Sequence, residues 1–310
     1  MLTYSAIGAQ ILRRRGVSEE RTGWASTVIA TVLCAGLFIT GSCEAFAGSF
    51  QRVFVGNFIG YSADPVNYFS VSGASSRGVS SASFYLEKTL SKNSSISLFA
   101  GIERLDIETG LATGWDNFSF SYKHTILSVP THEFALALNP LFELPMRTTG
   151  ADAESHPRWG IELLAEKGLA DLPKSLRVLR AAAVEGDVAW ETKVSGAPDD
   201  LVSADAEIEY SIDYFDRYTC PGCAGEELRG FSPHLDLDYD QYTSAHRNIS
   251  SPVFYLVPAL AWLNSDFEIN LGAEVALNRG SSSDGSVGFV WLIGVSLDDI
   301  VPGAKWTPFN

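Results

Sequence analysis

Apolar and polar residues alternate with a period of two over long stretches of this chain. Between Val202 and Tyr214 every second residue is apolar, and the residues between them are acidic or serine. A period of two is typical of an extended strand, whose side chains point alternately to its two faces. The pattern predicts a strand at 202–215, which is long enough to cross a bilayer because a tilted spanning strand needs about nine to eleven residues.

The same alternation returns in other parts of the chain, for example at 184–191 and 267–278. The expected strands lie within 50–73 and at 81–90, 95–107, 114–126, 133–144, 158–167, 179–193, 202–215, 231–243, 252–263, 267–278 and 286–297. Lipid cannot hydrogen-bond a sheet edge, so such strands span a membrane only when the sheet closes on itself. The sequence therefore predicts an all-β fold, a closed antiparallel transmembrane β-barrel of about twelve strands.

The first 47 residues have the features of a secretory signal peptide. Basic residues Arg13–Arg15 precede an apolar run at 24–39, and Ala45-Phe46-Ala47 offers a small-x-small cleavage site. We therefore divide the chain into a signal peptide at 1–47 and an outer-membrane β-barrel domain at 48–310. An uncleaved anchor helix is the alternative, although the apolar run is shorter than the roughly 20 residues that a helical span needs.

The lengths of the connections predict which end of the barrel faces the periplasm. Short connections at 91–94, 127–132 and 264–266 share one end if the strands alternate in direction, and outer-membrane barrels keep short turns on the periplasmic side. The connections expected at the external end are 145–157, 194–200, 244–251 and 279–285. The long stretch 216–230 is placed at the periplasmic end, against this trend.

Several short motifs resemble those of an exported barrel family. They are Gly114-Trp115-Asp116-Asn117-Phe118 with Tyr122-Lys123, Pro130 with His132-Glu133-Phe134, Lys167-Gly168-Leu169 with Asp171-Leu172-Pro173, and Leu297-Asp298-Asp299-Ile300-Val301-Pro302. Over 68–302 the chain resembles an uncharacterised Gram-negative outer-membrane β-barrel family, which is similar to phenol meta-degradation and transporter-like barrels. The resemblance implies an outer-membrane location and no established substrate. The chain departs from most barrels at its end, where a tail follows the last strand.

Acidic residues dominate the polar face of three neighbouring strands. If the apolar faces of these strands meet lipid, the side chains that line the lumen are Glu185, Asp187, Glu191, Asp205, Glu207, Glu209, Asp213, Asp236, Asp238 and Asp240. Like charges on facing strands lie about 4.5 to 5.5 Å apart and repel each other. Three interpretations stay open: a solvated interior neutralised by residues such as Lys123 and Arg104, a cation-selective conduit, or a specific metal site. We predict no bound metal and no cofactor.

The pair Cys220-Pro221-Gly222-Cys223 is a second candidate site. A structural zinc needs four ligands, and the sequence offers no second cysteine pair downstream of the signal peptide. His234 and His246 are expected near opposite ends of one strand. In an oxidising periplasm, a disulfide between Cys220 and Cys223 that braces a turn is the favoured interpretation. Metal capture and thiol exchange are the alternatives.

Other sequence features restrict the function. The formal net charge is −15 at pH 7, which argues against a nucleic-acid partner because phosphate binding needs clustered Lys and Arg. The sequence contains no G-x-S-x-G, H-E-x-x-H, Walker or G-x-G-x-x-G motif, so we predict that the protein is not an enzyme. The expected function is a passive or weakly selective conduit for small polar or cationic solutes, surrounded by outer-membrane lipid. The alternative is a closed structural or binding barrel, in which inward side chains or the segment 48–67 fill the lumen.

Overall fold

The computed structural model describes residue 58 and residues 62–76, 79–107, 110–146, 156–195, 199–244, 252–264, 267–278, 287–300 and 307–308. The signal peptide expected at 1–47 and its cleavage site lie outside these residues. Within the described part of the chain, no helix combines the length and apolar character that crossing a bilayer requires.

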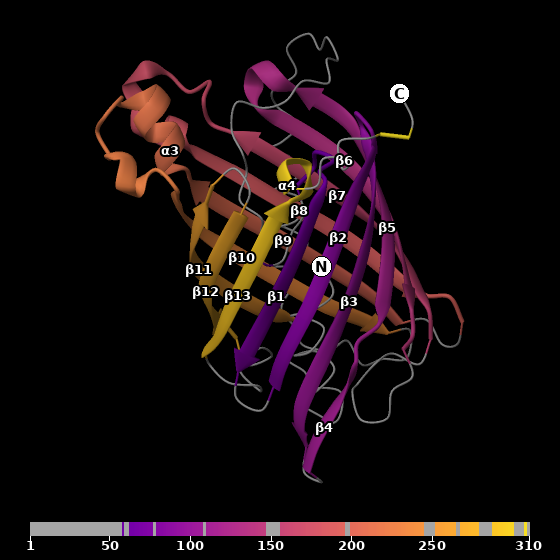
Figure 1. The fold of residues 1–310 in the computed structure, drawn as a ribbon. Coiled ribbons are helices and arrows are strands. Elements are labelled where there is room, and N and C mark those ends of the chain that lie inside the picture. The colour runs from indigo at the N-terminus through magenta and orange to yellow at the C-terminus, as the bar shows by residue number, and fades with distance from the viewer. Residues whose placement is uncertain are drawn as a thin grey trace.

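A single antiparallel sheet forms nearly all of the structure (Figure 1). Its strands are β1 (Tyr68–Ser76), β2 (Val79–Ser91), β3 (Ser94–Ile107), β4 (Gly110–Trp115), β5 (Phe118–Val129), β6 (Phe134–Leu144), β7 (Arg158–Gly168), β8 (Ala182–Lys193), β9 (Asp199–Tyr210), β10 (Phe231–Ser244), β11 (Val253–Leu263), β12 (Phe267–Ala276) and β13 (Val287–Ser296). The sheet closes because β1 pairs with β2 on one side and with β13 on the other.

Two of these strands share one position in the barrel. β4 pairs with residues 102–107 of β3, whereas β5 pairs with residues 94–99 of the same strand. The 13 strands therefore make a closed 12-strand antiparallel barrel. This confirms the predicted fold class.

The two faces of each strand differ as the period of two predicts. Large apolar side chains are exposed on the outer face, among them Phe84, Ile96, Phe120, Tyr122, Ile161, Val184, Ile208, Leu235, Leu237, Leu260, Ile269, Leu271, Phe289 and Ile293. The alternate side chains point into the barrel and are mostly small, hydroxylated or acidic. An apolar exterior and a polar interior are what a barrel in lipid requires.

The strand predicted at 202–215 is shorter than expected. β9 ends at Tyr210, and a short helix α3 (Ile212–Tyr214) follows it. The Ser211 hydroxyl accepts a hydrogen bond from the Tyr214 N–H at 3.2 Å, which caps this helix. Asp213 was therefore wrongly placed on the strand; it lies in α3 and forms an ion pair with Arg217 at 2.8 Å.

The connections predicted to share one end of the barrel do lie at the same end. The links β2–β3, β5–β6, β7–β8, β9–β10 and β11–β12 all lie at the end where β1 begins and β13 ends. This end carries the helices: η1 (Pro130–His132), η2 (Lys174–Ala181), α3, η3 (Phe215–Thr219), η4 (Glu226–Leu228) and α4 (Leu297–Ile300). Figure 1 shows α3 and α4 together at this end. We call it the helical end.

Candidate functional site: the barrel interior

Carboxylates from four neighbouring strands line one side of the barrel interior. We call this set the acidic wall: Glu162 and Glu166 of β7, Glu185, Asp187 and Glu191 of β8, Asp205, Glu207 and Glu209 of β9, and Asp236, Asp238 and Asp240 of β10. Every member has 4% or less of its surface exposed. Nine of the ten carboxylates that the sequence predicts at the lumen belong to the wall, and Asp213 does not.

The strand register places the acidic wall in rows. Glu166 lies opposite Glu185, which lies opposite Glu207, which in turn lies opposite Asp236. A second row lies two residues further along the strands, where Asp205 lies between Asp187 and Asp238. Cross-strand neighbours of like charge destabilise a sheet. Each row thus brings together carboxylates that repel one another when all are ionised.

Five of the eleven members of the acidic wall have no hydrogen-bond partner within the described part of the chain. Both carboxylate oxygens of each of five residues are buried without a hydrogen-bond partner: Glu185, Asp187, Asp205, Glu207 and Asp236. A buried carboxylate of this kind is costly unless a proton, a cation or water satisfies it. These five carboxylates are therefore the part of the wall that most needs a partner beyond the described residues.

Lys123 and Arg104, the basic residues named as possible partners of the wall, lie in different places. Lys123 of β5 pairs with Glu87 of β2 at 2.8 Å, and both side chains are almost completely buried. Arg104 is exposed, so it does not face the interior. Arg158 of β7 lies beside the wall, with Nε 3.6 Å from Glu191 Oε2. Arg104 therefore does not neutralise the wall, whereas Lys123 is paired with Glu87 and also attracts Glu162 and Glu166 of the wall.

The opposite side of the interior is lined mainly by hydroxyl groups. We call the buried residues Ser70, Ser83, Ser95 and Ser97 of β1–β3 the hydroxyl wall. Glu87 of β2 lies on this side and accepts hydrogen bonds from Lys123 Nζ at 3.1 Å, Ser95 Oγ at 2.5 Å and Val66 N at 3.1 Å. Unlike the acidic wall, this side satisfies its buried charge.

The segment before β1 lies inside the barrel. Glu166 Oε2 accepts hydrogen bonds from Ser62 Oγ and from Ala63 N, both at 2.9 Å. The Ser62 carbonyl accepts from Lys123 Nζ at 2.7 Å, and the Ala63 carbonyl accepts from Thr125 Oγ1 at 2.9 Å. Residues 62–67, which we call the inner segment, are thereby fixed between the two walls.

Phe58, which precedes the inner segment, and Asn67, which ends it, contact opposite parts of the barrel. Phe58 packs with Val257, Val290 and Leu292 on the far side, and its ring centroid lies 6.0 Å from that of His234. Asn67 binds the helical end: its Nδ2 donates to Asp298 Oδ1 at 2.8 Å, and its carbonyl accepts from Leu297 N at 2.9 Å. Residue 58 and residues 62–66 therefore lie in the interior, and Asn67 lies at the helical end. This agrees with the alternative in which the segment 48–67 fills the lumen, as far as the described residues of that segment go.

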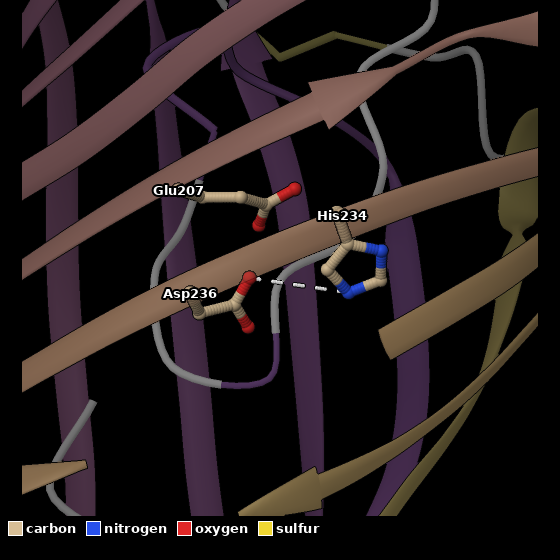
Figure 2. A group of neighbouring side chains, drawn as sticks. All are labelled: Glu207, His234 and Asp236. Atoms are coloured by element: carbon tan, nitrogen blue, oxygen red, sulfur yellow. Dashed lines mark ion pairs between the residues drawn. The ribbon is translucent and has the colours of Figure 1, made fainter. Parts of the chain in front are cut away.

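Sequence reasoning missed several interior residues. Glu162 and Glu166 were overlooked because Leu164, also buried, interrupts the acidic residues on that face of β7. His234 was considered only as a distant partner for the cysteines. Figure 2 shows it on β10 beside Asp236, with Glu207 of β9 facing them. The signal was present, since His234 and Asp236 are two residues apart on one strand and must share a face.

Cys220 and Cys223 lie at the helical end, in the connection between β9 and β10. The structure places their sulfur atoms in a disulfide. Next to it, the Asp216 carboxylate accepts hydrogen bonds from Ala224 N at 2.8 Å and Arg229 Nε at 2.6 Å. The hydrogen bond from the Ala224 backbone N–H and the hydrogen bond from the Arg229 guanidinium both lower the pKa of Asp216.

Two of the motifs that resemble the exported barrel family meet at the helical end. Asp171 Oδ2 lies 3.0 Å from both Lys167 Nζ and His132 Nδ1. Partial burial of Asp171 raises the pKa of its carboxyl group. The hydrogen bonds from Lys167 and His132 outweigh this and lower the pKa of Asp171 below its ordinary value. The Gly168 N–H donates to the Glu133 carbonyl at 2.8 Å, and a Cβ atom on Gly168 would clash with the Glu133 side chain. These motif residues tie two neighbouring connections together.

Comparison with known proteins supports the fold. An outer-membrane channel from Pseudomonas putida F1 has a TM-score of 0.52 at 12% identity, with 79% of this chain and 99% of that chain covered. The KdgM porin and the NanC porin each have a TM-score of 0.45, at 8% and 11% identity, with 74% of this chain and 98% of each porin covered. No protein family and no curated protein matches the sequence. The resemblance to phenol meta-degradation barrels therefore stays a prediction.

Proposed function

We propose that the protein is a conduit in the outer membrane of a Gram-negative bacterium, passing small polar or cationic solutes with weak selectivity. The observation that carries this proposal is the acidic wall, where five buried carboxylates have no hydrogen-bond partner in the described part of the chain. Fixed negative charge along a narrow, partly desolvated passage concentrates cations and repels anions. Solutes that carry positive charge would satisfy the wall as they pass.

Passage requires the inner segment to move. Its contacts with Glu166, Lys123 and Thr125 are four hydrogen bonds, each of which contributes about 0.5–1.5 kcal/mol net, or more where a charge takes part. Together with the bond from Val66 N to Glu87, these contacts can break without unfolding the barrel, while Asn67 stays bound to Asp298 and Leu297 at the helical end. The segment is attached to β1 at Tyr68, so it can leave the lumen at the helical end.

A closed structural or binding barrel is the second candidate. The inner segment and the cluster of Ala63, Ala135, Ala137 and Leu164 favour it, because they place packed apolar atoms within the interior. In that case the acidic wall holds protons, water or cations permanently rather than passing them. The two candidates differ in whether solutes cross.

The proposal that the protein is an outer-membrane conduit includes four further properties of the chain. They are the cleaved signal peptide at 1–47, the periplasmic position of the helical end, the lack of catalytic activity, and surrounding partners limited to outer-membrane lipid and small solutes. The likeness to phenol meta-degradation barrels is compatible with a conduit but names no solute for this chain.

Swelling of proteoliposomes tests the proposal. Vesicles containing the refolded barrel would be transferred into iso-osmotic solutions of a small sugar, a small organic cation salt or a small organic anion salt, beside vesicles without protein. Faster swelling than in empty vesicles, with the cation entering faster than the anion, is expected from the wall's charge. Swelling at the rate of empty vesicles for every solute would favour the closed barrel.

A further inference from the structure

We propose that Glu207, His234 and Asp236 form a binding site for one divalent transition-metal ion inside the barrel. The site is part of the acidic wall, but it does not depend on the lumen being open to solutes. Figure 2 shows the three side chains converging from β9 and β10.

Strand geometry explains why these three residues meet. His234 and Asp236 are two residues apart on β10, so both point inward, and Glu207 lies directly opposite Asp236 on β9. One ligand atom from each residue lies within 4.8 Å of the others, and His234 Nε2 is 4.0 Å from Asp236 Oδ1. Ligand atoms around a tetrahedral zinc ion lie about 3.3–3.5 Å from one another. Small side-chain movements therefore bring all three atoms into coordination distance.

Burial without partners is the independent observation that points to a ligand. Glu207 is 1% exposed and Asp236 is 0% exposed, and none of their four carboxylate oxygens accepts a hydrogen bond from a described residue outside the site; they face each other and His234. The row continues with Glu185, which also has no such partner. Two adjacent buried carboxylates without donors have a strong unmet need for positive charge. A divalent cation between them supplies it.

The surroundings of His234 favour a neutral ring that offers a nitrogen lone pair. Its Nδ1 lies 3.4 Å from the Ser232 carbonyl, an arrangement in which Nδ1 carries the proton and leaves Nε2 as an acceptor. Nε2 faces Asp236 and lies 3.2 Å from Asn270 Nδ2, a long contact that a metal ion would replace. A backbone carbonyl on the far nitrogen is the usual support for a metal-binding histidine.

The donor set selects a class of metal. One imidazole nitrogen with two carboxylates suits first-row divalent ions such as Zn²⁺, Mn²⁺ and Co²⁺, whereas Mg²⁺ and Ca²⁺ prefer oxygen ligands alone. A neutral imidazole and two carboxylates balance the charge of one divalent ion. Diffuse attraction of cations to the acidic wall would show no such preference, because it acts on charge alone.

Zinc titration of the refolded protein by calorimetry tests the site. The unmodified chain is compared with H234Q, which removes the nitrogen ligand and keeps every carboxylate, and with D205N, which removes an unpartnered carboxylate from the neighbouring row. We expect one zinc ion per chain, an affinity lowered more than about tenfold in H234Q, and nearly unchanged binding in D205N and in about a hundredfold excess of Mg²⁺. The variant C220S/C223S should also bind normally.

Four outcomes would overturn the proposal: no stoichiometric zinc in the unmodified chain, unchanged affinity in H234Q, an equal loss in D205N, or loss of zinc in C220S/C223S. If H234Q does not refold, electron paramagnetic resonance of Cu²⁺ in the unmodified chain decides instead. Coupling to one imidazole nitrogen supports the site, and a spectrum with oxygen ligands only refutes it. These measurements are made at equilibrium without a solute gradient, so they succeed or fail independently of conduction.

Discussion

Glu87 and Glu207 occupy opposite sides of the same barrel interior, and both are almost completely buried. Glu87 accepts hydrogen bonds from Lys123, Ser95 and Val66, whereas neither oxygen of Glu207 has a partner in the described part of the chain. A buried charge that is paired and hydrogen-bonded holds its surroundings together, whereas one without partners destabilises the fold or binds something else. The comparison separates a structural side of the interior from a side suited to cations.

The contacts of the inner segment also differ between the two sides of the interior. On the structural side its backbone accepts hydrogen bonds from Lys123 and Thr125, and on the acidic side it reaches only Glu166, at the edge of the wall. The unpartnered carboxylates of β8–β10 receive no hydrogen bond from its described residues. The segment thus occupies the interior, and its described residues leave the unpartnered carboxylates of β8–β10 without a donor.

Replacing Lys123 should have the largest effect. K123M keeps much of the side-chain volume but leaves Glu87 buried without its cation, and breaking a buried pair in this way costs about 3–5 kcal/mol. The free energy of unfolding, measured in urea in the presence of lipid vesicles, should fall by this amount.

E207Q is the matched change on the other wall. It removes a charge that has no partner, so stability should stay the same or rise. If E207Q destabilises the barrel as much as K123M does, the two walls do not differ and the comparison is wrong.

A change on the outer face of β10 comes next in size. Leu237 lies near the middle of this strand and is 39% exposed, so L237R would place a charge in lipid and cost about 2–4 kcal/mol. Ile208 is a poorer test position because β9 ends at Tyr210. D238N, at the next residue, points inward and should not destabilise; equal losses in both variants would mean that the two faces of β10 are assigned incorrectly.

The outcomes for β9 and β10 show how far the sequence determines the fold. Strict alternation fixes which side chains face inward, so nine carboxylates of the wall were predicted from a local pattern. The same pattern continued by chance beyond Tyr210, where Ser211 caps a helix instead, and Asp213 was therefore misplaced.

Long-range contacts were not predictable in this way. Ser62 and Glu166 are 104 residues apart, and no periodicity shows that the segment before β1 returns to the interior and binds β7. Lys123 likewise lies on a strand that was predicted. Its ion pair with Glu87 was not predictable, because β5 and β2 come close only in the closed barrel.

Loosening the inner segment should have a moderate effect. E166A removes the acceptor for Ser62 Oγ and Ala63 N, and hydrogen bonds to a charged group contribute about 1.5–3 kcal/mol each. The segment should leave the lumen more often, which would be measured as more frequent channel openings in planar bilayers. T125V, which removes one neutral hydrogen bond, should produce a smaller increase; a decrease in either variant would contradict the blocking role.

The smallest effect is expected at the helical end, away from both walls. The pKa of Asp216 is lowered in the fold by the Ala224 amide and Arg229, so this carboxylate stabilises the β9–β10 connection above its unfolded pKa. The stabilisation is lost as the pH falls through the lowered folded value. Amide hydrogen exchange of residues 220–229 should accelerate, relative to its intrinsic rate, over this acidic range in the unmodified chain but not in D216N. The same pH dependence in both would assign the effect to another group.

The reversal potential under a KCl gradient tests the central claim most directly. The unmodified barrel in planar bilayers should prefer K⁺ over Cl⁻, and E185Q/E207Q should lower this preference because it neutralises two adjacent unpartnered carboxylates of the acidic wall. Raising the salt concentration should reduce the difference, since mobile ions that enter the lumen screen its fixed charges, with a screening length of about 8–10 Å at physiological ionic strength. A barrel that conducts nothing, passes both ions equally, or keeps its selectivity in E185Q/E207Q would contradict the account.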